Sequence, residues 1–125
     1  MKKIALVLAI LAMAGCKPSN DQVTDIAKKE IGEIMKDPDS AKFSDLVTKE
    51  IGSGSNGKFA YCVIGNVNGK NSFGAYSGPT PFAMTLVLES GSLPFITPNY
   101  QIGSRVLANG EANVIRYKAI TQLCR

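Results

Sequence analysis

The sequence predicts an α+β fold in which a helix at each end packs on a small antiparallel sheet of three or four strands. Three observations support this prediction. Apolar residues recur with helical spacing within 19–35 and 111–124. Two apolar runs, 59–65 and 82–88, are rich in residue types that favour strands. Stretches rich in Gly, Ser, Asn and Pro separate these segments and predict turns.

The first fifteen residues have the pattern of a signal peptide. Met1-Lys2-Lys3 is a short basic start, and residues 4–14 form an unbroken apolar run, followed by Gly15 and Cys16. A helix that spans a membrane needs roughly 20 apolar residues, so this run is too short to stay in the membrane as one. We therefore expect the chain to be exported.

The residues Met13-Ala14-Gly15-Cys16 resemble the lipobox of bacterial lipoproteins, although leucine is usual at the position of Met13. The resemblance implies cleavage before Cys16 and a diacylglyceryl group on its sulfur, which anchors the mature chain in a membrane. Lys17 follows in place of the aspartate that favours inner-membrane retention, which implies an outer-membrane location facing the periplasm in a Gram-negative host. An ordinary cleaved signal with a chance cysteine and an uncleaved anchor are the alternatives. The expected organisation is a signal peptide (1–15), a short tether (16–20) and a single domain (21–125).

Composition narrows the expected ligands. Loss of Lys2 and Lys3 with the signal peptide lowers the formal net charge from +4 to +2, with twelve basic residues against ten acidic ones. The basic residues are scattered and no basic run alternates with aromatics, so we expect no nucleic-acid partner. The sequence has no histidine and only three cysteines, so we expect neither a metal nor another cofactor.

Cys62 and Cys124 remain when Cys16 carries the lipid. An even pair of cysteines in a small exported domain predicts a disulfide. Closing a loop of this length stabilises a fold by about 4 kcal/mol in the chain-entropy model. The bond would clamp the last helix to the central strand, and two buried thiols are the alternative.

The first helix is predicted from Ser19-Asn20-Asp21-Gln22, which has the Ser-x-x-Gln form of a capping box. Glu30 and Glu33 fall on the side interpreted as solvated. The helix should end at Lys36-Asp37-Pro38, because a residue before proline disfavours the helical conformation, and 37–41 should form a turn or a single helical turn. The predicted apolar stripe consists of Val23, Ile26, Ala27, Ile31, Ile34 and Met35.

The first three strands are predicted around two turns. Residues 43–51 carry no helical stripe and are interpreted as a strand, which the turn at 52–57 ends. Residues 59–65 are apolar on both faces, as expected of a central strand. Asn68-Gly69 favours a type I′ hairpin with a return strand over 71–76.

The carboxyl-terminal half is predicted to hold one more strand and a helix. Residues 82–88 form the strand, and residues 89–104, rich in Ser, Gly and Pro, are interpreted as a loop. Residues 111–124 are interpreted as the last helix, with a less regular extended conformation as the alternative. Its apolar face is predicted to consist of Ala112, Ile115, Ala119, Ile120 and Leu123.

Motifs that suggest catalysis fail on inspection. Residues 52–58 match G-x-x-x-x-G-K, but Phe59 replaces the Ser or Thr that holds magnesium, and a strand follows instead of a helix. Ser55-Asn56-Gly57-Lys58 matches Ser-x-x-Lys, yet Asn-Gly prevents the helix that this pair needs. Without histidine no Ser-His-Asp or Cys-His site can form, and Asp37 and Asp39 are typical turn residues. We expect no enzyme.

Five of the nine aromatic residues lie in the Gly-, Pro- and Ser-rich region 66–100. Aromatic side chains on such loops commonly form a recognition surface. The alternative is that they pack against the ends of the sheet. The candidate binding surface consists of Phe73, Tyr76, Phe82, Phe95 and Tyr100.

Two stretches, Asp37-Pro38-Asp39-Ser40-Ala41-Lys42-Phe43 and Val67-Asn68-Gly69-Lys70-Asn71-Ser72-Phe73-Gly74-Ala75-Tyr76-Ser77-Gly78, occur with Cys62 between them and Cys124 near the carboxyl end. Together they resemble a group of small secreted or lipid-anchored proteins of bacteria and their prophages. The resemblance implies a shared small fold with a disulfide and ancestry in a mobile element. It transfers no catalytic residue.

Two classes of function follow. The first is a lipid-anchored binding module close to the membrane, with an envelope or phage protein as its partner; the prophage resemblance suggests exclusion of a second infecting phage. The second is an envelope structural or stress lipoprotein without a specific ligand.

Overall fold

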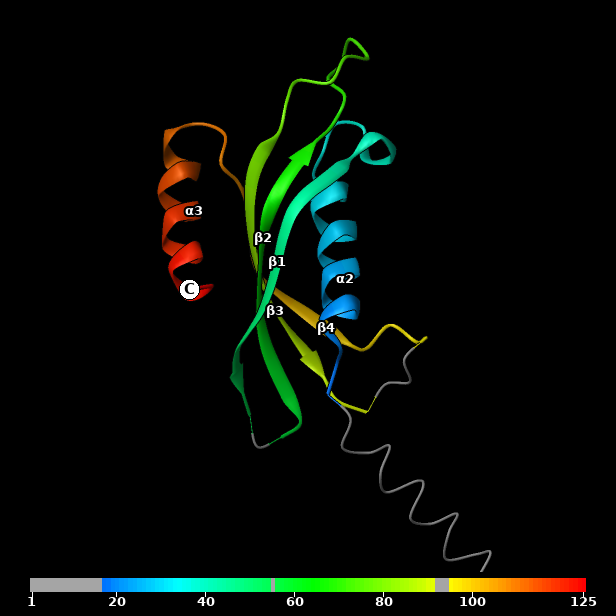
Figure 1. Ribbon diagram of the computed structural model, residues 1–125, viewed down its shortest axis with the longest axis vertical. Coiled ribbons are helices and arrows are strands. Elements are labelled where there is room, and N and C mark those ends of the chain that lie inside the picture. Colours follow the sequence, from blue (N-terminus) through cyan, green and yellow to red (C-terminus); the bar gives the residue numbers. More distant parts are fainter. Residues whose placement is uncertain (1–16, 55, 92–94) are drawn as a thin grey trace, which may run out of the picture.

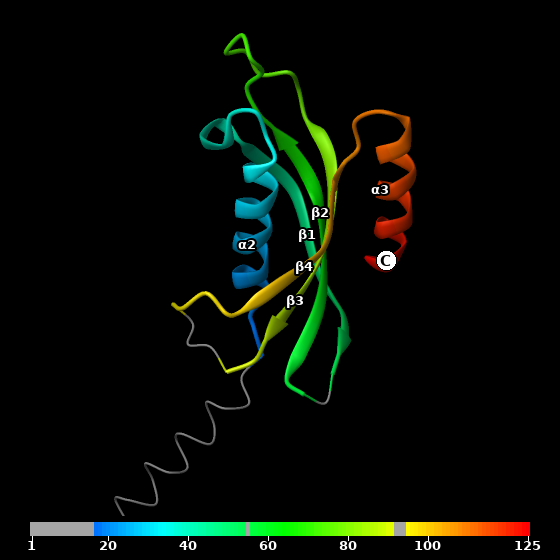
Figure 2. The ribbon, with the colours of Figure 1, turned by 180° about the vertical axis from the view of Figure 1, so that it is seen from behind.

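The protein folds into one antiparallel sheet with a helix on each face (Figures 1 and 2). The computed structural model describes residues 17–54, 56–91 and 95–125. The strands lie in the order β1-β2-β3-β4, with α2 on one face and α3 on the other. The elements are α2 (Asn20–Glu33), the 3-10 turn η1 (Pro38–Ser40), β1 (Lys42–Ser53), β2 (Lys58–Asn68), β3 (Thr80–Glu89), β4 (Tyr100–Leu107) and α3 (Glu111–Leu123). The predicted α+β class, with two terminal helices and one disulfide, is confirmed.

Helix α2 begins where its capping box predicts. The Ser19 side chain accepts a hydrogen bond from the Gln22 backbone N–H (3.2 Å), and the Gln22 side chain accepts one from the Ser19 N–H (3.0 Å). The helix ends at Glu33, and Pro38 then opens η1. Along the helix Val23, Ile26, Ala27 and Ile31 are buried, as predicted, and Ile34 is exposed.

The core lies between α2 and the two central strands. Side chains of β2 and β3 alternate between the faces of the sheet, and the antiparallel register pairs Tyr61 with Leu86 and Val63 with Met84. These residues face α2. The core cluster consists of Val23, Ile26, Ala27, Ile31, Tyr61, Val63, Val67, Phe82, Met84, Leu86 and Leu88.

The predicted return strand over 71–76 is wrong, because β2 is followed by an irregular loop before β3. A type I′ turn needs positive φ at both central residues, and neither Asn68 nor Gly69 has it. Gly69 is instead buried where a Cβ would lie 2.7 Å from Met35 Cε. The Asn68 side chain accepts a hydrogen bond from the Gly78 N–H across the loop (3.1 Å).

The prediction that 89–104 is a loop is wrong in its last part, because β4 begins at Tyr100 and pairs with β3 along the edge of the sheet. The register shifts between Thr85 and Leu86, where Gly103 is the extra residue. A Cβ on Gly103 would lie 2.6 Å from Thr85 Oγ1, so only glycine fits there without a shift. The bulge interrupts the alternation of apolar and polar residues that identifies a strand.

Helix α3 forms as predicted, but it presents another face to the sheet. Ala112, Ile115, Ala119 and Leu123 are exposed, and none of the helical residues is fully buried. The half-buried residues are Asn113, Val114, Tyr117, Ile120 and Thr121. Cys124, which follows the helix, is buried and bonded to Cys62 of β2. The predicted disulfide is present, and it directs this side of the helix inward.

The residues just before α2 are bound to the domain. Lys17 Nζ lies 2.9 Å from Glu50 Oε2 of β1. The hydrogen bond to Glu50, together with the attraction between the two charges, raises the pKa of Lys17. The Tyr61 hydroxyl donates a hydrogen bond to the carbonyl of Pro18, which is buried (3.1 Å). Residues 17–20 therefore do not form a free tether. The predicted signal peptide and Cys16, the predicted site of the lipid, lie outside the described residues.

Candidate functional site

The structure does not bring the five predicted surface aromatics together. Phe82 is fully buried and packs edge-on against Phe43, with 5.9 Å between ring centroids. Phe73 and Tyr76 lie on the loop between β2 and β3. Phe95 lies on the connection between β3 and β4, and Tyr100 is the first residue of β4. This connection lies near the start of α2, toward the other end of the molecule (Figure 1). Phe82 therefore belongs to the hydrophobic core and not to an exposed surface.

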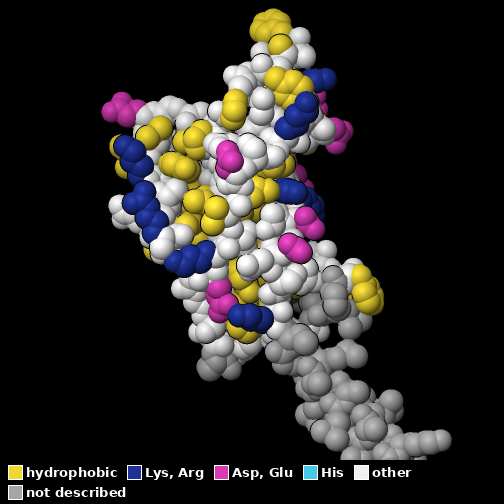
Figure 3. Space-filling model, viewed as in Figure 1, with side chains coloured by type: hydrophobic (Ala, Val, Ile, Leu, Met, Phe, Trp, Pro, Cys, Tyr) yellow, Lys and Arg dark blue, Asp and Glu magenta, His cyan; other side chains and the backbone are white. Residues whose placement is uncertain are grey.

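The loop between β2 and β3, which we call the distal loop (residues 69–79), lies at one end of the long axis of the molecule, and the chain before α2 lies toward the other end (Figure 1). The Phe73 side chain is 94% exposed. Hydrophobic, Lys or Arg, and Asp or Glu side chains all lie at this end of the molecule (Figure 3). Burial of a Phe side chain is worth about 1.5–3 kcal/mol. Phe73 gains almost none of this free energy within the domain.

The distal loop is held by its own hydrogen bonds. Asn71 Oδ1 accepts from the backbone N–H of Phe73 (2.9 Å) and of Ala75 (3.2 Å). The Asn71 N–H donates to the Ala75 carbonyl (2.8 Å), and the Gly74 N–H donates to the Asn71 carbonyl (3.1 Å). Gly74 adopts φ +78° with no neighbour within 4 Å of an added Cβ, so its conformation and not its size requires glycine. These bonds fix the backbone that carries Phe73.

Three lysines, which we call the lysine collar (Lys36, Lys42 and Lys70), surround the base of this loop. Lys42 Nζ lies 4.5 Å and Lys70 Nζ 5.7 Å from the centroid of the Tyr76 ring, within the range of cation–π contacts. Lys36 Nζ donates to Ser72 Oγ (3.1 Å). Within the described chain, ion pairs shorter than 4.0 Å join only Lys17 to Glu50 and Arg105 to Glu30. No carboxylate lies within 4.0 Å of a collar lysine among these residues, although Asp37 and Asp39 belong to the adjacent turn η1.

The two stretches that carry the prophage resemblance meet at Ser40. Its hydroxyl donates to the Asp37 carbonyl (2.8 Å) and accepts from the Lys70 N–H (2.8 Å). The Ser40 carbonyl accepts from the Tyr76 hydroxyl (3.1 Å). Although about 30 residues separate Ser40 from the loop, the two stretches form one unit. In the sequence the three collar lysines are part of the scattered basic residues. Their proximity is evident only from the folded structure.

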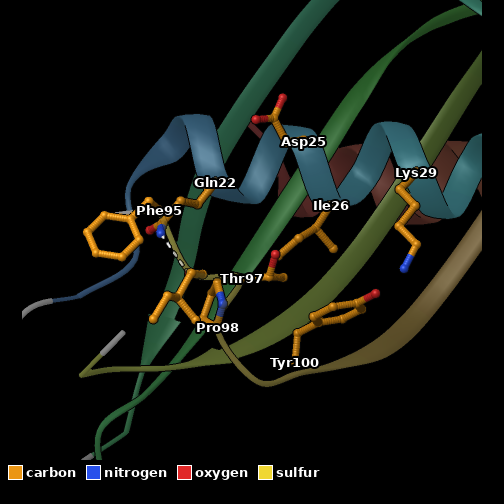
Figure 4. A pocket seen from close by; sticks show the side chains of 9 residues that line it. Gln22, Asp25, Ile26, Lys29, Phe95, Thr97, Pro98 and Tyr100 are labelled. Atoms are coloured by element: carbon orange, nitrogen blue, oxygen red, sulfur yellow. Dashed lines mark hydrogen bonds between the residues drawn. The ribbon is translucent and has the colours of Figure 1, made fainter. Parts of the chain in front are cut away.

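A groove of about 350 Å³ lies at the other end, between α2 and the residues that lead into β4 (Figure 4). Asp25 and Lys29 of α2 lie on one side, and Thr97, Pro98 and Tyr100 lie on the other. Asp25 and Lys29 are exposed charges of opposite sign. The groove could hold a small polar group, and the titratable side chains that line it are Asp25, Lys29 and Tyr100.

Beside this groove is a buried polar cluster that the sequence did not predict. Glu30, interpreted as solvated, is only 7% exposed. Its Oε1 accepts from the Tyr100 hydroxyl (2.6 Å), and its Oε2 accepts from Arg105 Nη1 (2.8 Å). Arg105 Nη1 also donates to the Glu30 carbonyl (3.1 Å). Both carboxylate oxygens are engaged, so Glu30 joins α2 to the edge strand β4 and is not free to act on a ligand.

Tyr100 should make stability depend on alkaline pH. The hydrogen bond to Glu30, followed by burial, raises the pKa of Tyr100 from 10 to about 12. Below pH 10 the Tyr100 phenol is protonated in both the folded and the unfolded chain, and its contribution to the free energy of unfolding is complete. Between pH 10 and 12 the unfolded chain ionises first, so the free energy of unfolding should fall as the pH rises. Denaturant midpoints at pH 9 and 11 should differ less in Tyr100→Phe than in the wild type. Equal differences would contradict this assignment.

Among residues 17–54, 56–91 and 95–125, no group of three or more His, Cys, Asp or Glu side chains lies close enough to hold a metal ion. No helix in this part of the chain is long and apolar enough to cross a membrane. Of residues 52–58, which match the nucleotide-binding pattern, Gly52 and Ser53 end β1 and Lys58 begins β2. No protein-family model matches the chain, and no curated protein or solved structure shows significant similarity to it. The site must therefore be interpreted from its own geometry.

Proposed function

We propose that this chain is a lipid-anchored envelope protein that acts as a non-catalytic binding module and contacts its partner through the distal loop and the lysine collar. The observation that carries the proposal is Phe73, 94% exposed on a loop whose backbone is fixed by the Asn71 hydrogen bonds. Single exposed apolar residues are common on protein surfaces. A large aromatic on a preorganised loop beside unpaired cations is more specific, because it combines an anchor with charge.

The chemistry of this surface indicates its partner. An aromatic side chain that enters a pocket of the partner is a usual centre of an interface. The lysine collar favours an acidic rim around that pocket and accelerates the encounter. Because the loop is already ordered, little conformational entropy is lost on binding. An acidic protein surface with an apolar pocket fits these requirements.

The position of the loop agrees with a membrane anchor at the other end. The distal loop and Lys17 lie at opposite ends of the long axis (Figure 1). A lipid on Cys16 would leave the loop pointing away from the bilayer that holds it, where an envelope or phage protein can reach it. We propose an outer-membrane location facing the periplasm, in line with the resemblance to lipoprotein sorting signals.

The resemblance to prophage-associated proteins suggests a biological role, which is exclusion of a second phage by blocking its receptor or injection machinery. Expression should lower plaque counts for at least one phage in a broad panel. Phe73→Ser should restore the counts, because loss of the aromatic weakens binding by about 2 kcal/mol, or roughly 30-fold. Plaque counts on cells with equal amounts of membrane-bound protein measure this.

Ile115→Ser is a matched control, because Ile115 is also apolar and exposed (65%) but lies on α3. It should leave exclusion intact. Unchanged infection by the whole panel would remove the exclusion role and favour a structural or stress lipoprotein. Full exclusion by Phe73→Ser would remove the distal loop as the binding surface. The intact mass of membrane-fraction protein tests the anchor separately, since it should correspond to residues 16–125 with acyl chains.

A further inference from the structure

A second exposed apolar group lies at the end of the domain opposite the distal loop. The side chains of Phe95 and Ile96 are 83% and 50% exposed. They are held in place, because Gln22 Nε2 donates to the Ile96 carbonyl (3.4 Å) and the nearby Pro98 is buried. Figure 4 shows Phe95 beside Gln22, next to the chain that leads into α2. Phe95 and Ile96 are thus exposed on a loop segment that is bonded to the first turn of α2.

The chain before α2 is fixed on the domain, so a lipid on Cys16 must start close to this end of the molecule. Lys17 is bonded to Glu50, and Pro18 is buried under the Tyr61 hydroxyl. Consecutive Cα atoms are about 3.8 Å apart, so a lipid on Cys16 begins one residue from a fixed point on the domain. The bilayer that receives the lipid must then approach this end of the molecule, where Phe95 and Ile96 are exposed.

We propose that Phe95 and Ile96 insert into the phospholipid headgroup and acyl boundary of the membrane that holds the Cys16 lipid. The inference rests on the proposed lipid anchor. Aromatic side chains favour this boundary, and a second attachment strengthens a lipid anchor. Two contact points, the lipid and the Phe95–Ile96 pair, also fix the orientation of the domain. They direct the distal loop away from the bilayer.

Tryptophan fluorescence can test this directly, because the sequence contains no tryptophan. Phe95→Trp, Ile96→Trp and the distal reference Phe73→Trp each supply one fluorophore. The mature lipidated proteins are reconstituted in phosphatidylcholine–phosphatidylglycerol vesicles with brominated acyl chains. A fluorophore at position 95 or 96 should emit at shorter wavelength and lose about half of its intensity, since interfacial side chains lie about 5–10 Å into the boundary. The fluorophore at position 73 should keep a water-exposed spectrum and be quenched by aqueous acrylamide.

The outcomes separate the inference from the anchor on which it rests. Equal acrylamide quenching at positions 95, 96 and 73 in acylated protein would overturn the membrane contact and leave the anchor intact. A fluorophore at position 95 that is shielded from acrylamide but not quenched by brominated lipid would mean that a second copy or another protein covers the pair, which also overturns it. If the intact mass shows no acyl chain, the same comparison is made after coupling Cys16 to a maleimide phospholipid. Quenching by brominated lipid at positions 95 and 96 would then support the contact although the native anchor had failed.

Discussion

Removal of the Cys62–Cys124 disulfide is expected to lower the free energy of unfolding by about 4 kcal/mol. The bond joins residues 62 positions apart, and an open loop of this length gives the unfolded chain much more conformational freedom. A small domain has a total stability of about 5–15 kcal/mol, so the loss is a large fraction of it. Guanidinium unfolding of the wild type, with and without reductant, and of Cys62→Ala/Cys124→Ala measures the change.

Besides this global loss, helix α3 should open locally when the bond is removed. Residues 111–123 include no fully buried side chain, and the helix contacts the sheet through half-buried residues such as Tyr117. Without the bond, the helix is held by this packing and by the hydrogen bond that Lys49 Nζ of β1 donates to the Arg125 carbonyl just after the helix. Hydrogen exchange in the double variant should therefore rise more in α3, which can open locally, than in the central strand β2, where it rises only through the lower global stability. If α3 amides kept the protection of β2 amides, packing rather than the disulfide would hold the helix.

The sequence predicted the elements that local chemistry specifies. The capping box at Ser19 fixed the start of α2, whereas the helix ends at Glu33, a few residues before the end predicted at 36–38. The run 59–65 was recognisable as a central strand because it is apolar on both faces. The turn at 69–79 and strand β4 could not be predicted in this way. Gly69 serves close packing against Met35, a distant residue, and the bulge at Gly103 interrupts the β4 pattern.

The wrong face predicted for α3 has an instructive cause. The stripe was chosen by hydrophobicity, which favoured Ile115 and Leu123. Cys124 provided a better reference, because a bond to the central strand requires it to face the sheet. Residues three, four and seven positions before Cys124 share its side of the helix. These are Thr121, Ile120 and Tyr117, and all three are half-buried. The predicted disulfide was therefore sufficient to predict which side of α3 faces the sheet.

The candidate site was only partly predictable. Exposed aromatics on loops were expected, and Phe73 meets that expectation. The lysine collar depends on contacts between segments about 30 residues apart, through Ser40, which no local pattern encodes. Glu30 is different, because it continues the stripe of Val23, Ile26 and Ala27 with helical spacing. A carboxylate in such a stripe indicates a buried ion pair, although the sequence does not reveal that Arg105 and Tyr100 complete it.

Glu30→Ala is expected to lower the free energy of unfolding by about 3 kcal/mol, the lower end of the range for breaking a buried ion pair by removing one partner. The variant leaves the Tyr100 hydroxyl without its acceptor and Arg105 without its counter-charge. The Arg105 side chain is 33% exposed, so water can solvate part of the orphaned charge and limit the loss. Denaturant unfolding at neutral pH measures the effect.

Two comparisons separate this cluster from general effects on α2. Glu33→Ala removes an exposed carboxylate from the same helix and should cost less than about 0.5 kcal/mol. Replacing all three groups, as Glu30→Leu/Tyr100→Phe/Arg105→Met, should recover most of the stability, because an apolar substitute leaves no buried group unpaired. Equal costs for Glu30→Ala and Glu33→Ala would mean that the cluster contributes nothing to stability. A triple variant as unstable as Glu30→Ala would mean that the pocket between α2 and β4 needs polar contacts to hold the edge strand in place.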